Sequence, residues 1–295
     1  MPPAVERDAC HVSFVEETFG DFYDGCISID VRGEHKPTEP AIQTMIERTW
    51  DEVLARAQRS NAVVFNGPLV RYLRHTSNGA GLHIEAERTD YATYLGTNQY
   101  NAERGAKTGW RDFADPLGAS AVIVTSDGYL VCGKRSDKVA SHPGFVHTFG
   151  GGVEPSSGGR INPFDEIRRE LCEELGLVES DIDSLVCRGL LRDATTRQPE
   201  LVYDCHAHLT LTQLSDRFSA VADHAEHISL SVCRDNGWSL SEFLRTARPI
   251  APVAFGALCF HGRRWFGEDW YTTNRCLDHT HCLARRCAPE GGAHD

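Results

Sequence analysis

The sequences GGGVEP at residues 150–155 and RELCEELGL at residues 169–177 predict the fold of this chain more specifically than any other part of it. Three consecutive glycines predict a turn in which the backbone approaches another group closely. The second stretch predicts an amphipathic helix, because Leu171 and Leu175 recur at helical spacing and Gly176 supplies a C-terminal stop. Together they predict a glycine turn ahead of an acidic helix.

Three glutamates of this helix lie close to one face. Glu170, Glu173 and Glu174 are spaced i, i+3 and i+4, and residues at this spacing are neighbours on a helix surface. Carboxylates this close raise one another's pKa unless a cation screens them. Mg²⁺ takes carboxylate oxygens as ligands, together with water and substrate phosphates. The spacing therefore predicts a divalent-cation site beside a diphosphate, and a solvated acidic helix face is the competing interpretation.

Residues 150–177 resemble the signature of the Nudix hydrolase family. The signature is a glycine, five residues, a glutamate, seven residues, and then Arg-Glu-aliphatic-any-Glu-Glu-any-Gly-aliphatic. Its second half is complete from Arg169 to Leu177. Its first half departs, because Ser157 stands where the glutamate would fall counting from Gly151. The loop is also longer, since residues 151 and 169 are 18 positions apart and the pattern has 14.

The resemblance implies a Nudix α/β/α sandwich with a mixed sheet and an enzyme that breaks a phosphoanhydride bond. It implies a site for Mg²⁺, or for Mn²⁺ in its place, formed by three carboxylates and one backbone carbonyl: Glu170, Glu173, Glu174 and Gly151. Such a cation neutralises the diphosphate and lowers the pKa of an attacking water. Arg169 is implied to hold a carboxylate in position. Glu226 is our candidate for the family's downstream acid, with an exposed polar loop as the alternative.

Similarity to the UDP-sugar-hydrolysing members of the family extends beyond the signature. It rests on residues 90–98, 115–118 and 135–144, and it covers roughly residues 20–262. It implies hydrolysis of UDP-glucose or UDP-galactose to UMP and the sugar 1-phosphate. It also implies three substrate-binding residues, one for the diphosphate and two for uridine or sugar: Arg135, Asn98 and Tyr94. A surface charge is the alternative for the arginine, and core packing or turn capping for the other two.

Residue types and spacing by themselves predict only metal-assisted cleavage of a nucleoside diphosphate compound. Two alternatives to a UDP-sugar diphosphatase therefore stay open. One is a Nudix hydrolase of ADP-ribose or a dinucleotide. The other is a non-catalytic nucleotide-binding module.

Composition limits the partners that we expect. A net charge of −12 argues against nucleic acid, whose binding needs a basic surface. Apolar runs fall short of the ~18 residues of a membrane span, and the start of the chain lacks the pattern of a signal peptide. Eleven scattered cysteines, an odd number, favour reduced thiols. We therefore expect a cytoplasmic protein with a small nucleotide-sugar substrate, without nucleic acid or membrane partners, and the oligomeric state stays open.

Periodicity divides the chain into two parts and a tail. Residues 1–113 predict a small α+β subdomain with a helix over residues 41–59. Its alternating apolar runs predict four strands: 26–31, 62–65, 69–74 and 82–86. The N-terminal 25 residues show no clear periodicity.

Residues 114–270 predict the Nudix domain. Two strands joined by the Asp127-Gly128 turn are followed by two further strands: 119–124, 129–132, 186–191 and 201–211. Ser239 predicts a helix N-cap, and residues 251–260 predict an apolar helix or strand. Residues 271–295 predict an irregular tail, in which Cys276 and Cys282 leave zinc binding open.

Overall fold

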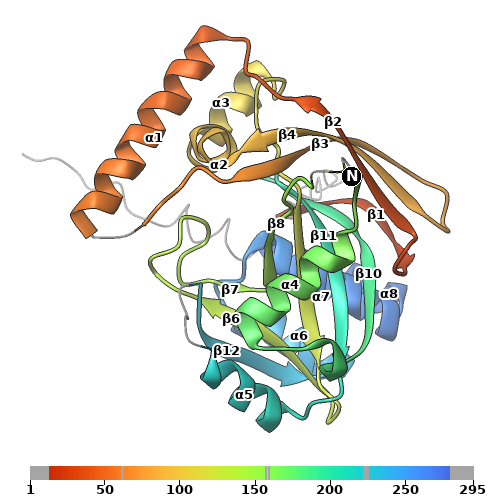
Figure 1. The fold of residues 1–295 in the computed structure, drawn as a ribbon. Helices are drawn as coiled ribbons and strands as arrows, with labels where there is room; N and C mark the ends of the chain where they lie inside the picture. The colour runs from red at the N-terminus through yellow and green to blue at the C-terminus, as the bar shows by residue number, and fades with distance from the viewer. Residues whose placement is uncertain (1–12, 61–62, 157, 159, 222–225, 280–295) are drawn as a thin grey trace, which may run out of the picture.

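The computed structural model describes residues 13–60, 63–156, 158, 160–221 and 226–279, which form two sheets flanked by helices (Figure 1). The larger sheet has the central order β1-β10-β11-β5-β6-β12, with β7 beside β6 and β8 beside β5. β11 and β5 are parallel and the other pairs are antiparallel, so the sheet is mixed, as predicted. Its strands are β1 (Phe14–Phe22), β5 (Gly118–Val124), β6 (Tyr129–Arg135), β7 (Val146–His147), β8 (Phe149–Gly152), β10 (Ile182–Asp193), β11 (Pro199–Ala207) and β12 (His227–Arg234).

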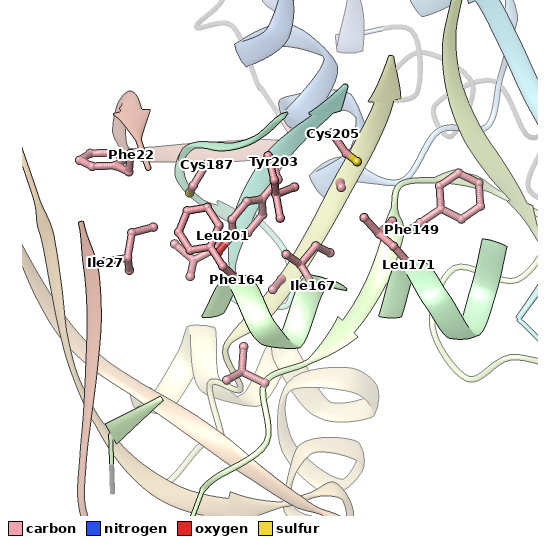
Figure 2. Close-up of a cluster of buried hydrophobic side chains, with 14 of the residues drawn as sticks. Phe22, Ile27, Phe149, Phe164, Ile167, Leu171, Cys187, Leu201, Tyr203 and Cys205 are labelled. Atoms are coloured by element: carbon pink, nitrogen blue, oxygen red, sulfur yellow. The ribbon is translucent and has the colours of Figure 1, made fainter. Parts of the chain in front are cut away.

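Helices cover both faces of this sheet. β5 is buried along its whole length, as expected of a strand between two layers. Its side chains alternate between two cores, because Ala121 and Ile123 pack with helix α4 (Pro163–Leu175), and Val122 and Val124 pack with helix α7 (Pro252–Phe266). Figure 2 shows the core on the α4 side. The architecture is therefore the predicted α/β/α sandwich.

The smaller sheet has the order β3-β4-β2-β9 and carries a helical layer. Its strands are β2 (Ile27–Glu34), β3 (Pro68–Ser77), β4 (Leu82–Asp90) and β9 (Arg160–Ile161). The helices are α1 (Pro40–Ser60), α2 (Tyr91–Tyr94), the π-helix η1 (Leu95–Gln99) and α3 (Tyr100–Thr108). The division at residue 113 stays a prediction, and the two sheets exchange strands across it, since β1 joins the larger sheet and β9 joins the smaller one.

Three local predictions are wrong. Residues 63–65, the described part of the predicted strand 62–65, do not form a strand. Val63 is 94% exposed, so its side chain is not buried in a sheet. Ser239 is not a cap, because helix α6 (Gly237–Thr246) is capped by Asn236, whose side chain accepts from the Ser239 amide. Irregular structure does not begin at residue 271, because Tyr271 is buried against the α7 core.

Helical structure continues through the start of the predicted tail, in α8 (Glu268–Asn274) and the 3₁₀ turn η3 (Arg275–His279). Cys282 lies outside the described residues. The remaining helices are the 3₁₀ turn η2 (Glu179–Asp181) and α5 (Leu211–Ala220). Within the described ranges, none of the helices has the length and apolarity needed to cross a bilayer.

A buried ion network joins α7 to the larger sheet. Asp204 on β11 accepts a 2.7 Å hydrogen bond from Arg188 on β10, and His261 on α7 lies 3.0 Å from the same carboxylate oxygen. The second ring nitrogen of His261 lies 3.0 Å from Asp235. Burial alone would lower the pKa of His261, but the two carboxylates raise it to about 9. Charged His261 therefore stabilises the folded state.

We predict that this network gives the protein a specific pH dependence of stability. Unfolded histidine titrates near pH 6.5, so the contribution of His261 is fully present below about pH 6.5 and is lost as the pH rises towards about 9. His261→Gln should lower the free energy of unfolding by about 3 kcal/mol at pH 6 and by less at pH 9. Urea unfolding at pH 6, 7.5 and 9 measures this, with His83→Gln on β4 as the control. An equal loss at all three pH values would contradict it.

Candidate active site

Helix α4 carries the acidic residues and is delimited by local signals. The Asn162 side chain caps its start by accepting from the Phe164 amide at 3.1 Å, and Pro163 fills the first turn. Gly176 ends it with a left-handed φ of 66°, as the sequence predicts. The apolar face packs on the sheet through Phe164, Ile167 and Leu171 (Figure 2). Leu175 belongs to the same buried core. Glu170 and Glu174 lie on the flank of the helix beside this apolar face, where they contact β8.

The three glycines form strand β8 instead of the predicted turn. β8 pairs with β5 and passes close to α4. A Cβ atom on Gly150 would lie 2.1 Å from the Ala119 carbonyl oxygen, and one on Gly151 would lie 2.6 Å from Oε1 of Glu170. Glycine is required at residue 150, where β8 lies against the backbone of β5, and glycine at residue 151 leaves room for the Glu170 carboxylate.

Glu174 is held against this strand. Its side chain is 9% exposed, and its Oε2 accepts a 2.7 Å hydrogen bond from the Gly150 amide. Its Oε1 is buried and lies 3.2 Å from Nδ1 of His227, although the two are not aligned as a hydrogen bond. Burial, followed by the charge of Glu226, raises the pKa of Glu174 to about 8. The carboxyl group is thus fixed in place but poorly stabilised as an anion.

Glu170 lies one helical turn before Glu174 and faces the same strand. Its side chain is 16% exposed, and Oε1 is 2.8 Å from a guanidinium nitrogen of Arg169. Burial raises the pKa of Glu170 to about 7, against the opposing charge of Arg169 and with help from Glu174. The structure therefore brings Glu170, Glu174 and Gly151 together, as predicted, while their roles stay a proposal.

Glu173 points elsewhere. Its side chain is 59% exposed and pairs with Arg169 at 3.1 Å. Arg169 also binds Glu166 at 3.1 Å, in addition to Glu170. Arg169 thus contacts three carboxylates, and its predicted role of holding one of them in position stays a proposal. The predicted convergence of Glu173 with the other two carboxylates is not present. Sequence reasoning missed Glu166, although its i, i+3 spacing to Arg169 was a visible signal.

Arg135 and Glu226 meet at the end of the sheet beside Glu174. Arg135 ends β6 and is 3.4 Å from the Glu226 carboxylate, which is 55% exposed. Its Nε donates to the Ser141 carbonyl oxygen at 3.0 Å. His227 starts β12 opposite Arg135. His227 is a site residue that the sequence did not reveal, because its partner comes from a distant helix.

Asn98 and Tyr94 lie in the helical layer of the smaller sheet. Asn98 is fully buried; its amide nitrogen donates to Asp115 and to the Thr196 carbonyl oxygen, and its amide oxygen accepts from the Asp115 backbone. The Tyr94 hydroxyl lies 2.9 Å from the side-chain oxygen of Gln198. These contacts fit the predicted alternatives of core packing and turn capping for Asn98, and substrate contact by either residue stays a prediction.

The donors present fit a hard divalent cation. In the part of the chain that the structure describes, no three His, Cys, Asp or Glu side chains form a ready-made metal group. Glu174 nevertheless keeps a buried oxygen without an aligned donor, and Glu170 lies against a glycine that leaves room for it. A cation would favour the charged carboxylates that burial disfavours. Oxygen donors of this kind suit Mg²⁺ or Mn²⁺.

The chain is similar to several curated proteins. Uridine diphosphate glucose pyrophosphatase NUDT22 of Bos taurus is 36% identical over 234 residues, which cover 68% of this chain and 79% of that protein. The protein of the same name in Homo sapiens is 28% identical over 216 residues, covering 63% of this chain and 70% of that protein. Nudix hydrolase 9 of Arabidopsis thaliana is 25% identical over 238 residues, covering 68% and 74%.

Solved structures and family models add two findings. A MutT Nudix hydrolase from Burkholderia pseudomallei superposes with a TM-score of 0.31 at 23% identity, covering 48% of this chain and 95% of that protein. No family model matches the chain.

We predict that Gly151→Ala weakens cation binding without unfolding the protein. The added methyl group would lie 2.6 Å from Oε1 of Glu170 and push that carboxylate aside. We expect Mn²⁺ affinity, measured by electron paramagnetic resonance, to fall about tenfold or more. Gly158→Ala in the segment that follows β8 is the control, because its Cβ meets no described atom within 4 Å. Equal Mn²⁺ affinity in the two variants would contradict the prediction.

Proposed function

The chain belongs to the Nudix hydrolase superfamily, and we propose that it is a Mg²⁺-dependent diphosphatase that hydrolyses UDP-glucose or UDP-galactose to UMP and the sugar 1-phosphate. As a member it is a pyrophosphohydrolase. The substrate is proposed from the relatives named uridine diphosphate glucose pyrophosphatase. One observation carries the chemistry: Glu170 and Glu174 face the glycine strand together, one helical turn apart and largely out of water.

Glu170 and Glu174 would hold the cation, with the backbone at Gly151 beside them. A bound cation neutralises a diphosphate and lowers the pKa of an attacking water. Arg169 fixes Glu170 by a 2.8 Å contact, and the Gly150 amide fixes Glu174 by a 2.7 Å hydrogen bond. These contacts keep both carboxylates turned towards β8, so their orientation does not have to be created when substrate binds.

Arg135 is proposed to bind the diphosphate. Its guanidinium is at the end of the sheet beside the two carboxylates, and it contributes to the electrostatic environment of Glu174. Glu226 is proposed as the downstream acid, because its exposed carboxylate lies next to Arg135 and its charge raises the pKa of Glu174. Both residues therefore belong to the same electrostatic cluster as the proposed metal ligands.

We predict that Glu174→Gln lowers turnover of UDP-glucose by at least ~100-fold while the protein stays folded. The amide keeps an oxygen for the Gly150 bond but loses the negative charge that would hold the cation. Release of phosphate from the products by a coupled phosphatase measures turnover, and Glu103→Gln on the exposed side of α3 is the control. Normal Mg²⁺-dependent turnover would rule out the proposed role. Glu226→Gln belongs in the same assay, where an unchanged rate would leave Glu226 as a loop residue.

A substrate panel tests the function itself. We predict that kcat/KM is highest for UDP-glucose or UDP-galactose among UDP-sugars, ADP-ribose, NADH and nucleoside triphosphates. A preference for ADP-ribose or NADH would support the proposed metal-dependent hydrolysis but would contradict the proposed UDP-sugar substrate. Nucleotide binding by calorimetry without turnover of any compound would instead identify a non-catalytic module.

A further inference from the structure

His227 is a buried imidazole whose place is set from several sides. It is 2% exposed and opens strand β12 opposite Arg135. Its ring packs edge-on against Phe149, with centroids 5.0 Å apart. A Cβ atom on Gly133 would lie 2.2 Å from the ring, so this glycine makes room for the imidazole. Strand pairing and packing therefore fix both the position and the direction of the ring.

The ring presents its two nitrogens to very different surroundings. Nδ1 lies 3.2 Å from Oε1 of Glu174, whereas Nε2 is buried without a hydrogen-bond partner among the described residues. A proton on Nδ1 gives the N–H an acceptor, and a proton on Nε2 would leave a buried donor unsatisfied. The separation of 3.2 Å is within hydrogen-bond range, so a small rotation of the ring or carboxylate aligns the bond.

We propose that His227 is a positioning residue that donates from Nδ1 to Glu174 and holds this carboxylate towards the cation site. With the Gly150 amide on Oε2, each oxygen of Glu174 then has one donor, and its remaining lone pairs keep a fixed direction. The inference rests on the proposed function, because it concerns a carboxylate that we propose as a metal ligand. Hydrogen bonds that orient ligands in this way typically change metal affinity by about 10- to 100-fold.

Two substitutions separate positioning from packing. His227→Asn places a side-chain N–H near the position of Nδ1 but leaves a gap against Phe149 and Gly133. His227→Leu fills more of that space but has no donor. If His227 only fills space, Mn²⁺ affinity should fall less in the Leu variant than in the Asn variant. A positioning role predicts the opposite order.

We therefore expect Mn²⁺ affinity, measured by electron paramagnetic resonance on the full chain, to fall at least about tenfold in His227→Leu. In His227→Asn it should stay within about threefold of the wild type, even if the melting temperature falls further than in the Leu variant. Equal affinities in the two variants, or weaker binding in the Asn variant, would overturn the inference while leaving the proposed function intact.

Nitrogen-15 NMR of histidine-labelled, metal-free protein above about pH 8, where Glu174 is charged and can accept a hydrogen bond, gives a readout independent of catalysis. The resonances of His227 are those lost in His227→Asn, and we expect them to report the Nδ1–H tautomer. The Nε2–H tautomer would overturn the inference. If the wild type binds no Mn²⁺, the inference and the proposed function fail together. Mn²⁺ binding without turnover of any UDP-sugar refutes only the proposed substrate.

Discussion

The close contact between strand β8 and helix α4 is the constraint on which the rest of the site depends. It exists because Gly151 lacks a side chain, which would collide with Glu170 on α4, while Gly150 lets β8 lie close to β5 at the Ala119 carbonyl oxygen. A wider separation would expose both carboxylates to water and break the hydrogen bond from the Gly150 amide to Glu174. Burying carboxylates is unfavourable unless they are paired. The fold therefore maintains an arrangement of negative groups that is best satisfied by a cation.

The departures from the family signature have structural counterparts. The missing glutamate at residue 157 does not leave Arg169 unsupported, since Glu166, Glu170 and Glu173 all lie within 3.1 Å of its guanidinium. The longer loop also has a structural role, because its end forms β9, which pairs with β2 of the smaller sheet. The insertion thus connects the acidic helix to the N-terminal half of the chain.

Helix ends and turns could be predicted from the sequence, because neighbouring residues determine them. Contacts between residues far apart in the sequence could not be predicted. The end of α4 follows from Gly176, and the turn between β5 and β6 from Gly128 with its φ of 78°. Helical spacing placed Glu173 with its neighbours, but positions i and i+4 differ by about 40° around the axis and i and i+3 by about 60° in the other direction. Only the first pair faces β8. The partner of His227 could not be predicted, because it depends on how β12 lies against α4.

Charge explains why the site must supply its own attraction for an anionic substrate. The chain has a net charge of −12, so the field of the whole protein opposes the approach of a diphosphate. Arg135 brings a positive group to the edge of the carboxylate pair, but Glu226 already partly neutralises it. Because burial raises the pKa of Glu170 to about 7 and of Glu174 to about 8, both carry protons for part of the time near neutral pH. In the proposed function, a divalent cation that displaces fewer than two protons would add positive charge next to Arg135, and substrate affinity would thereby be coupled to metal binding.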